Sequence, residues 1–163
     1  MRSIKVKKNG FTLIEALVYI SVSSILLVVI TSLGYTVFIN RQKALANEEI
    51  LENANLVFSK IEKNIRESRE VILPITSGNE LSLEMENVDI NPTRFYLDGS
   101  TIYFAQSTGV GSNITTDNIE ITDLSFTKIV NNFSGVSIKT SITLSSSRAG
   151  VSLTLTSSFN LPR

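Results

Sequence analysis

The sequence has 163 residues, with 15 basic and 15 acidic side chains and a formal net charge of zero. This length suits one domain with a modest core, and the charge balance gives no electrostatic footprint for nucleic acid. Histidine and cysteine are both absent. Disulfides, thiolate metal sites, a Ser–His–Asp triad and a zinc hydrolase site are therefore excluded, and we expect neither an enzyme nor a cofactor.

The first 40 residues divide into a basic leader and an apolar segment. Residues 1–10 contain basic side chains but no acid, and no charged residue lies between Glu15 and Arg41. As a helix, residues 16–40 span roughly 37 Å, which is enough to cross a hydrocarbon core of ~30 Å. The positive-inside rule predicts that residues 1–10 stay cytoplasmic and that the rest of the chain is exported.

Two ordinary fates are open to such a segment. A signal peptidase could cut after Ala44-Leu45-Ala46 and leave Asn47 as the new terminus, although the apolar segment exceeds a typical signal-peptide core of about 7–15 residues. The segment could instead stay uncut as a signal anchor. Neither fate explains the sequence Gly-Phe-Thr-Leu-Ile-Glu at residues 10–15.

Residues 10–15, between the basic leader and the apolar segment, resemble the type III signal of type IV pilins and their relatives. The resemblance implies cleavage between Gly10 and Phe11 by prepilin peptidase, N-methylation of Phe11, and Glu15 at the family's invariant fifth mature position. It also implies four partners: the peptidase/methylase, other pilin or pseudopilin subunits bound through the N-terminal helix, an inner-membrane assembly platform, and membrane lipid before assembly.

The cost of placing the Glu15 carboxylate in a membrane offers a physical reason for its role in that family. A carboxylate at membrane depth costs about 2.5–3.5 kcal/mol unless it is paired. The new amine on Phe11 of a neighbouring subunit could neutralise Glu15 and set the axial register. Alternatively, Glu15 lies in the headgroup zone, where an acid in the first turn favours the helix dipole. The sequence departs from many pilins by placing Ser32 where they carry a proline, and Gly34 could weaken the helix there by up to ~1 kcal/mol.

Residues 41–73 continue the helical pattern as an amphipathic stretch. An apolar stripe at three- and four-residue steps predicts a helix to about Val71, stopped by Pro74. We expect this stripe to pack on a sheet, because the strands that follow need a cover, rather than to form a coiled-coil seam. Glu62–Arg66, Lys63–Glu67 and Arg66–Glu70 are predicted i,i+4 ion pairs. The stripe consists of Leu51, Ala54, Phe58, Ile61, Ile65 and Ile72, with Ser68 in the gap and Val57 widening it.

Residues 74–163 form the predicted β-rich head. Ser77-Gly78-Asn79 indicates a turn, and alternating apolar residues then predict about six short antiparallel strands. They lie near residues 81–86, 94–97, 101–105, 119–126, 136–144 and 151–155. Asp98-Gly99 is the predicted hairpin turn, and the aromatics Phe95, Tyr96, Tyr103 and Phe104 are expected to be core and hairpin pairs. Asp89, Asp98, Asp117, Glu120 and Asp123 lack the dense spacing of a calcium loop.

The predicted fold is therefore α+β and pilin-like, with a long N-terminal helix packed on an antiparallel β-sheet head. The expected parts are a removed leader (1–10), a transmembrane and assembly helix (11–40), its amphipathic continuation (41–73) and an exported head (74–163). The hairpin at 97–99 and the strand at 119–126 resemble minor pilins and pseudopilins of the J/W type.

The predicted function is a structural subunit of a type IV pilus, type II secretion or DNA-uptake filament. The subunit would wait in the bacterial inner membrane and then join an extracytoplasmic filament. The alternative is a single-pass membrane-anchored extracytoplasmic binding module. No metal or catalytic residue is predicted, and the head ligand is unknown.

Overall fold

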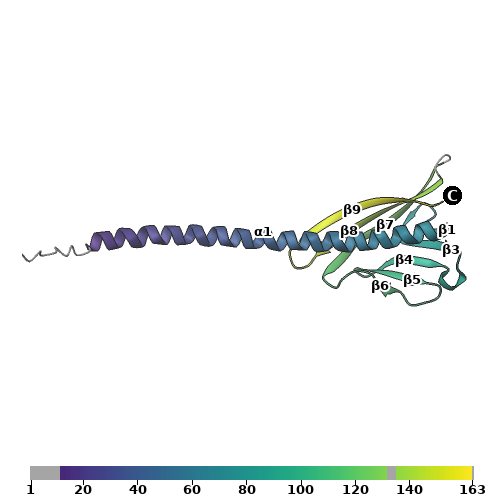
Figure 1. The fold of residues 1–163 in the computed structure, drawn as a ribbon, viewed down its shortest axis with the longest axis horizontal. Helices are drawn as coiled ribbons and strands as arrows, with labels where there is room; N and C mark the ends of the chain where they lie inside the picture. The colour runs from purple at the N-terminus through teal and green to yellow at the C-terminus, as the bar shows by residue number, and fades with distance from the viewer. Residues whose placement is uncertain (1–11, 132–134, 163) are drawn as a thin grey trace, which may run out of the picture. The chain divides into compact units, whose positions relative to one another are not determined.

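A computed structural model describes residues 12–131 and 135–162. One helix, α1 (Leu13–Glu67), comes first, and the described chain then forms nine strands and a short 3-10 turn, η1 (Val88–Ile90). The chain divides into two compact units between Arg41 and Gln42, and α1 contributes to both. Helix first and antiparallel strands afterwards confirm the predicted pilin-like α+β fold (Figure 1).

The helix ends four residues before the predicted end at Val71, so that prediction was wrong. α1 stops at Glu67, and β1 (Ser68–Leu73) begins at once. The Ser68 hydroxyl donates to the Ile65 carbonyl (2.8 Å), which satisfies one of the unpaired acceptors at the helix end. Because the next residues pair with β3 (Glu80–Met85), a partner distant in sequence overrides the helical period.

This early end also changes the predicted ion pairs. Glu70 lies in β1, so Arg66–Glu70 is not a helical i,i+4 pair. The predicted Glu62–Arg66 pair is confirmed, with Arg66 Nη2 2.7 Å from Glu62 Oε1. Both side chains are largely exposed, so the pair contributes only about 0.3–0.5 kcal/mol to stability.

The buried face of α1 lies one residue away from part of the predicted stripe. Leu51 is 44% exposed, whereas Ile50 is fully buried, and Val57 rather than Phe58 forms the centre of the stripe. The preference for a sheet over a coiled-coil seam is supported, because the stripe joins the core of the head. The buried helical residues are Ala46, Ile50, Asn53, Ala54, Val57, Ile61, Asn64 and Ile65.

The first sheet has the order β1-β3-β4-β5-β6, with antiparallel pairing throughout. Its remaining strands are β4 (Thr93–Asp98), β5 (Thr101–Gln106) and β6 (Ser112–Asn113). The predicted hairpin is confirmed: β4 and β5 pair around a turn in which Gly99 has a φ of 62°, a region that glycine enters without steric cost. The predicted aromatic pairs are cross-strand contacts, with ring centroids 5.1 Å apart for Phe95–Phe104 and 5.8 Å for Tyr96–Tyr103.

The second sheet has the order β2-β7-β8-β9. Its strands are β2 (Ser77–Gly78), β7 (Ile119–Asn131), β8 (Gly135–Ser146) and β9 (Val151–Asn160). Two predictions were wrong here: Ser77-Gly78 forms a strand with β7 instead of a turn, and the described part of residues 74–163 holds eight strands, with β1 before them, instead of about six short ones. The pairing of Ser77 with Thr127 joins residues too far apart in sequence for a local pattern to indicate it.

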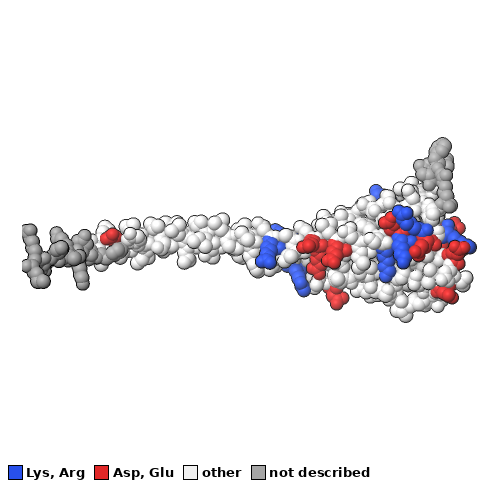
Figure 2. Space-filling model, viewed as in Figure 1, with Lys and Arg blue, Asp and Glu red and all other residues white. Residues whose placement is uncertain are grey.

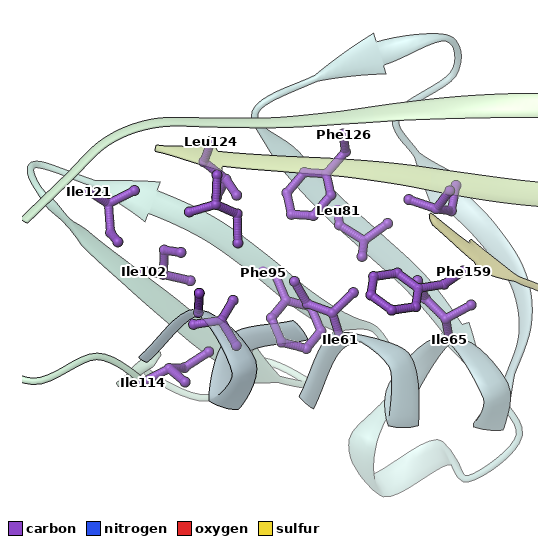
Figure 3. Close-up of a cluster of buried hydrophobic side chains, with 14 of the residues drawn as sticks. Ile61, Ile65, Leu81, Phe95, Ile102, Ile114, Ile121, Leu124, Phe126 and Phe159 are labelled. Atoms are coloured by element: carbon purple, nitrogen blue, oxygen red, sulfur yellow. The ribbon is translucent and has the colours of Figure 1, made fainter. Parts of the chain in front are cut away.

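The core of the head lies where α1 meets both sheets. Figure 3 shows Ile61 of α1 beside Phe95 of the first sheet and Ile65 of α1 beside Phe159 of the second sheet, with Ile121, Leu124 and Phe126 farther from the helix. Phe58 also contacts Phe159 of β9, with ring centroids 6.1 Å apart. The second-sheet side chains labelled in this view are Ile121, Leu124, Phe126 and Phe159.

Candidate functional site

The candidate site is the start of α1, which Thr12 caps. The Glu15 amide donates to the Thr12 hydroxyl (3.3 Å) and carbonyl (3.1 Å), and the Ala16 amide also donates to the Thr12 carbonyl (3.1 Å). A threonine three residues before a glutamate is the signature of a helix N-terminus. This role of Thr12 was not predicted from the sequence, although the Thr-x-x-Glu spacing indicates it.

Glu15 lies in the first turn of α1 and is exposed. This position supports the helix-dipole interpretation, because an acid there faces the unpaired N–H groups at the helix start. The dipole interaction does not compete with pairing to a second subunit, since the exposed carboxylate can accept further hydrogen bonds. Gly10 and Phe11, the predicted cleavage residues, lie outside the described residues.

The helix surface that follows is apolar on every side. The large apolar residues from Leu13 to Phe38 are 49–82% exposed, so this segment has no single buried stripe. Figure 2 shows uncharged surface between the acid near the start of α1 and the first basic side chains beyond it. Within the described residues, α1 is the one helix long and apolar enough to cross a membrane.

Four hydroxyl side chains in this segment are satisfied within the helix. Ser21, Ser24 and Thr31 donate to carbonyls one turn back, at 2.7–2.8 Å, and Thr36 does the same at 3.0 Å. This is the pattern that lets serine and threonine occupy an apolar helix without an unpaired polar group. These four hydroxyls therefore do not oppose insertion into lipid.

The helix runs through Ser32 and Gly34 without a break. A side chain added at Gly34 would meet open space, because no atom other than the helix backbone close to it in sequence lies within 4 Å of the position of its Cβ. No contact within the chain therefore requires glycine at this position. The sequence expectation that Gly34 could weaken α1 rests on its helix propensity alone.

The acidic residues of the head do not converge. Within the described residues, no group of three or more Asp and Glu side chains is placed to hold a metal ion. Asp89 lies in η1 and Asp98 ends β4, whereas Glu120 and Asp123 lie on β7. The start of α1 thus remains the site to which the sequence and the structure both point.

Comparison with known protein families gives a match that includes the start of α1. Residues 5–31 match the family model described as the prokaryotic N-terminal methylation motif. No curated protein and no solved structure matches the chain. The matched range covers the basic residues from Lys5 onward, the Gly10–Phe11 junction, the capped start of α1 and Glu15. The chain therefore carries the N-terminal methylation motif of type IV pilin-like proteins, at the start of the long helix of a pilin-like α+β fold.

Proposed function

We propose that this protein is a structural subunit of an extracytoplasmic filament of the type IV pilus, type II secretion or DNA-uptake class. The observation that carries the proposal is the apolar surface of residues 13–40, exposed on all sides and placed directly after the methylation motif. Lipid covers such a surface before assembly, and the helices of neighbouring subunits cover it afterwards. Pilin-like proteins are typically non-enzymatic structural subunits, in keeping with the missing histidine and cysteine.

The proposed processing removes residues 1–10 and methylates the new amine of Phe11. Prepilin peptidase cuts on the cytoplasmic side, which is where the basic leader holds the N-terminus. The inner membrane then holds the subunit by a single span, with the head exported, until the assembly platform inserts it into the filament. Cleavage leaves Phe11 four residues before Glu15, close to it in depth.

Glu15 acts as the register group in this proposal. Its exposed carboxylate meets the Phe11 amine of an adjacent subunit when two helices pack with an axial offset. The pair neutralises both charges, and other offsets leave a charge unpaired in an apolar bundle. The finer assignment to minor pilins or pseudopilins of the J/W type rests on the β4–β5 hairpin and on β7.

An intact-mass measurement after co-expression with a prepilin peptidase tests the processing. We expect the mass of residues 11–163 plus one methyl group, and a Gly10→Leu variant should keep the full leader because the peptidase no longer finds its small residue. A chain that keeps residues 1–10 in the presence of an active peptidase would contradict the proposal. A new terminus at Asn47 would instead indicate an ordinary signal peptide.

The register role of Glu15 needs a separate experiment. Glu15→Ala should leave the subunit in the membrane but lower its recovery in sheared filaments by about tenfold or more, because the Phe11 amine loses its partner. Glu48→Ala removes an exposed acid from the same helix beyond the apolar segment and is the matched control. Equal recovery of Glu15→Ala and Glu48→Ala in filaments would refute the register role.

A further inference from the structure

Three of the four sheet edges in the described chain are protected against pairing with another strand. β1 and β6 end the first sheet, and β2 and β9 end the second. β2 and β6 have only two residues each. β1 carries Arg69 and Glu70 and has two register shifts against β3. Short strands, charged residues and bulges are the devices by which proteins keep sheet edges from recruiting other chains.

β9 has none of these protections. It runs for ten residues without a charge, a proline or a glycine. Its pairing with β8 is regular over ten consecutive positions, from Ser137↔Asn160 to Ser146↔Val151. Among the described residues, the main chain of β9 pairs only with β8, so its outer row of N–H and C=O groups is open. A long, regular and uncharged edge of this kind is a template for one more strand.

The side chains of β9 define what such a strand must present. Val151, Leu153 and Leu155 are only half-buried on the inner face, whereas Ser152 and Thr154 begin an exposed row of hydroxyl residues on the outer face. An added strand places its own side chains beside both rows, because alternate residues of neighbouring strands share a face. The fitting segment therefore alternates apolar residues with small polar ones.

The charged residues near β9 further restrict which segment can bind. No acidic residue occurs after Asp123, and the charged residues that follow are all basic. Lys139 of β8 is exposed and lies opposite Ser158, and Arg148 lies in the turn that leads into β9. Both ends of β9 thus have a basic neighbour, which favours a segment with acidic residues at its flanks.

We propose that β9 binds an extended, uncharged segment of a different protein, flanked by acidic residues, as a fifth strand of the second sheet. A second copy of this chain fits less well. β9–β9 pairing about a two-fold axis would bring the Arg148 end of one copy toward the Lys139 end of the other, where like charges oppose the contact. This choice of partner rests on the charges around β9, whereas the open edge rests on the order of strands in the sheet.

A peptide-capture assay on the full chain in detergent tests the proposal. The probe is a fluorescein-labelled peptide of alternating valine and serine residues that carries two glutamates at each end. The comparison peptide carries lysines instead. We expect the glutamate-flanked peptide to bind about tenfold or more tightly than the lysine-flanked one. Amide hydrogen exchange within residues 151–160 should slow when it binds.

Two matched variants distinguish binding at the edge of the sheet from binding on its face. Thr156→Lys puts a charge on β9, and Ser141→Lys puts the same charge on its direct neighbour in β8. Thr156→Lys should weaken peptide binding by about tenfold or more, as charged edge residues do, and Ser141→Lys should leave it unchanged. Thr154→Lys serves as a second edge variant in case the first one disturbs folding.

Three outcomes would overturn the proposal. The glutamate-flanked peptide could fail to bind, or Ser141→Lys could weaken binding as much as Thr156→Lys. The full chain could also dimerise by itself through β9, seen in sedimentation and abolished by Thr156→Lys, which would identify a second copy as the occupant. The assay uses uncleaved protein, so its failure is distinct from a failure of cleavage between Gly10 and Phe11.

Discussion

The two halves of α1 belong to one continuous helix but bury their apolar side chains in different ways. Between Gln42 and Glu67 the buried residues form one stripe, and Ile61 in that stripe is fully buried by the head. Between Leu13 and Asn40 the apolar residues occupy every side, and Ile25 there is 65% exposed. The same residue type in the same helix is thus buried by the described chain in one half and left exposed by it in the other.

In the proposed function, this difference separates the residues that fold the head from those that assemble the filament. A one-sided stripe is enough to hold a helix against two sheets, because the opposite side faces water. A helix that is apolar all round requires an environment that is apolar all round, which lipid or a bundle of neighbouring helices supplies. Substitutions in the two halves should therefore affect different measurements.

The largest difference in head stability is expected between Ile61→Ala and Ile25→Ala. Ile61→Ala leaves a cavity in the core and should lower the free energy of unfolding of the head by about 2–5 kcal/mol. Ile25→Ala removes an exposed side chain and should leave the head unchanged. Hydrogen exchange of the slowest amides of β8, measured on the full chain in detergent, reports the free energy of unfolding of the head in each variant. An equal loss in the two variants would show that the head depends on the apolar half.

A smaller effect is expected from the polar contact between α1 and the head. Asn53 is 4% exposed, and its Oδ1 accepts from the Thr116 amide (3.0 Å) while its Nδ2 donates to the Glu49 carbonyl (2.9 Å). Asn53→Ala should cost about 1 kcal/mol of head stability. Asn55→Ala, at an exposed position of the same helix, is the control and should have no effect. Chemical denaturation in detergent measures both, and identical midpoints would contradict the predicted role of Asn53.

The sequence was most informative where the signal is local. The basic leader, the apolar segment and the order of residues around Gly10, Phe11 and Glu15 are contiguous, so one stretch was enough to indicate the motif that the family model later matched. The Asp98-Gly99 hairpin was predictable for the same reason, because a two-residue turn depends on its own residues. The cap at Thr12 was equally local and could have been predicted.

The sequence was least informative where distant segments decide the structure. Ile72 fits a helical period, yet it lies in β1 because that segment pairs with β3. β2 became a strand through its pairing with Thr127 and Phe126 of β7. The open edge of β9 was also unpredictable, since an edge is defined by the order of strands in the finished sheet.

The smallest predicted effect tests whether the apolar half behaves as an independent helix. Gly34→Ala should stabilise α1 locally by up to about 1 kcal/mol, which slows exchange of nearby amides by about fivefold, because alanine has the higher helix propensity and its Cβ meets open space. Ser59→Ala makes a similar change at an exposed position in the half packed on the head. Amides around Ser59 open mainly when the whole head unfolds, so their exchange should follow global stability. If Gly34→Ala also slowed the exchange of the slowest amides of β8, the two halves of α1 would be energetically coupled. That result would refute the assignment of separate roles to them.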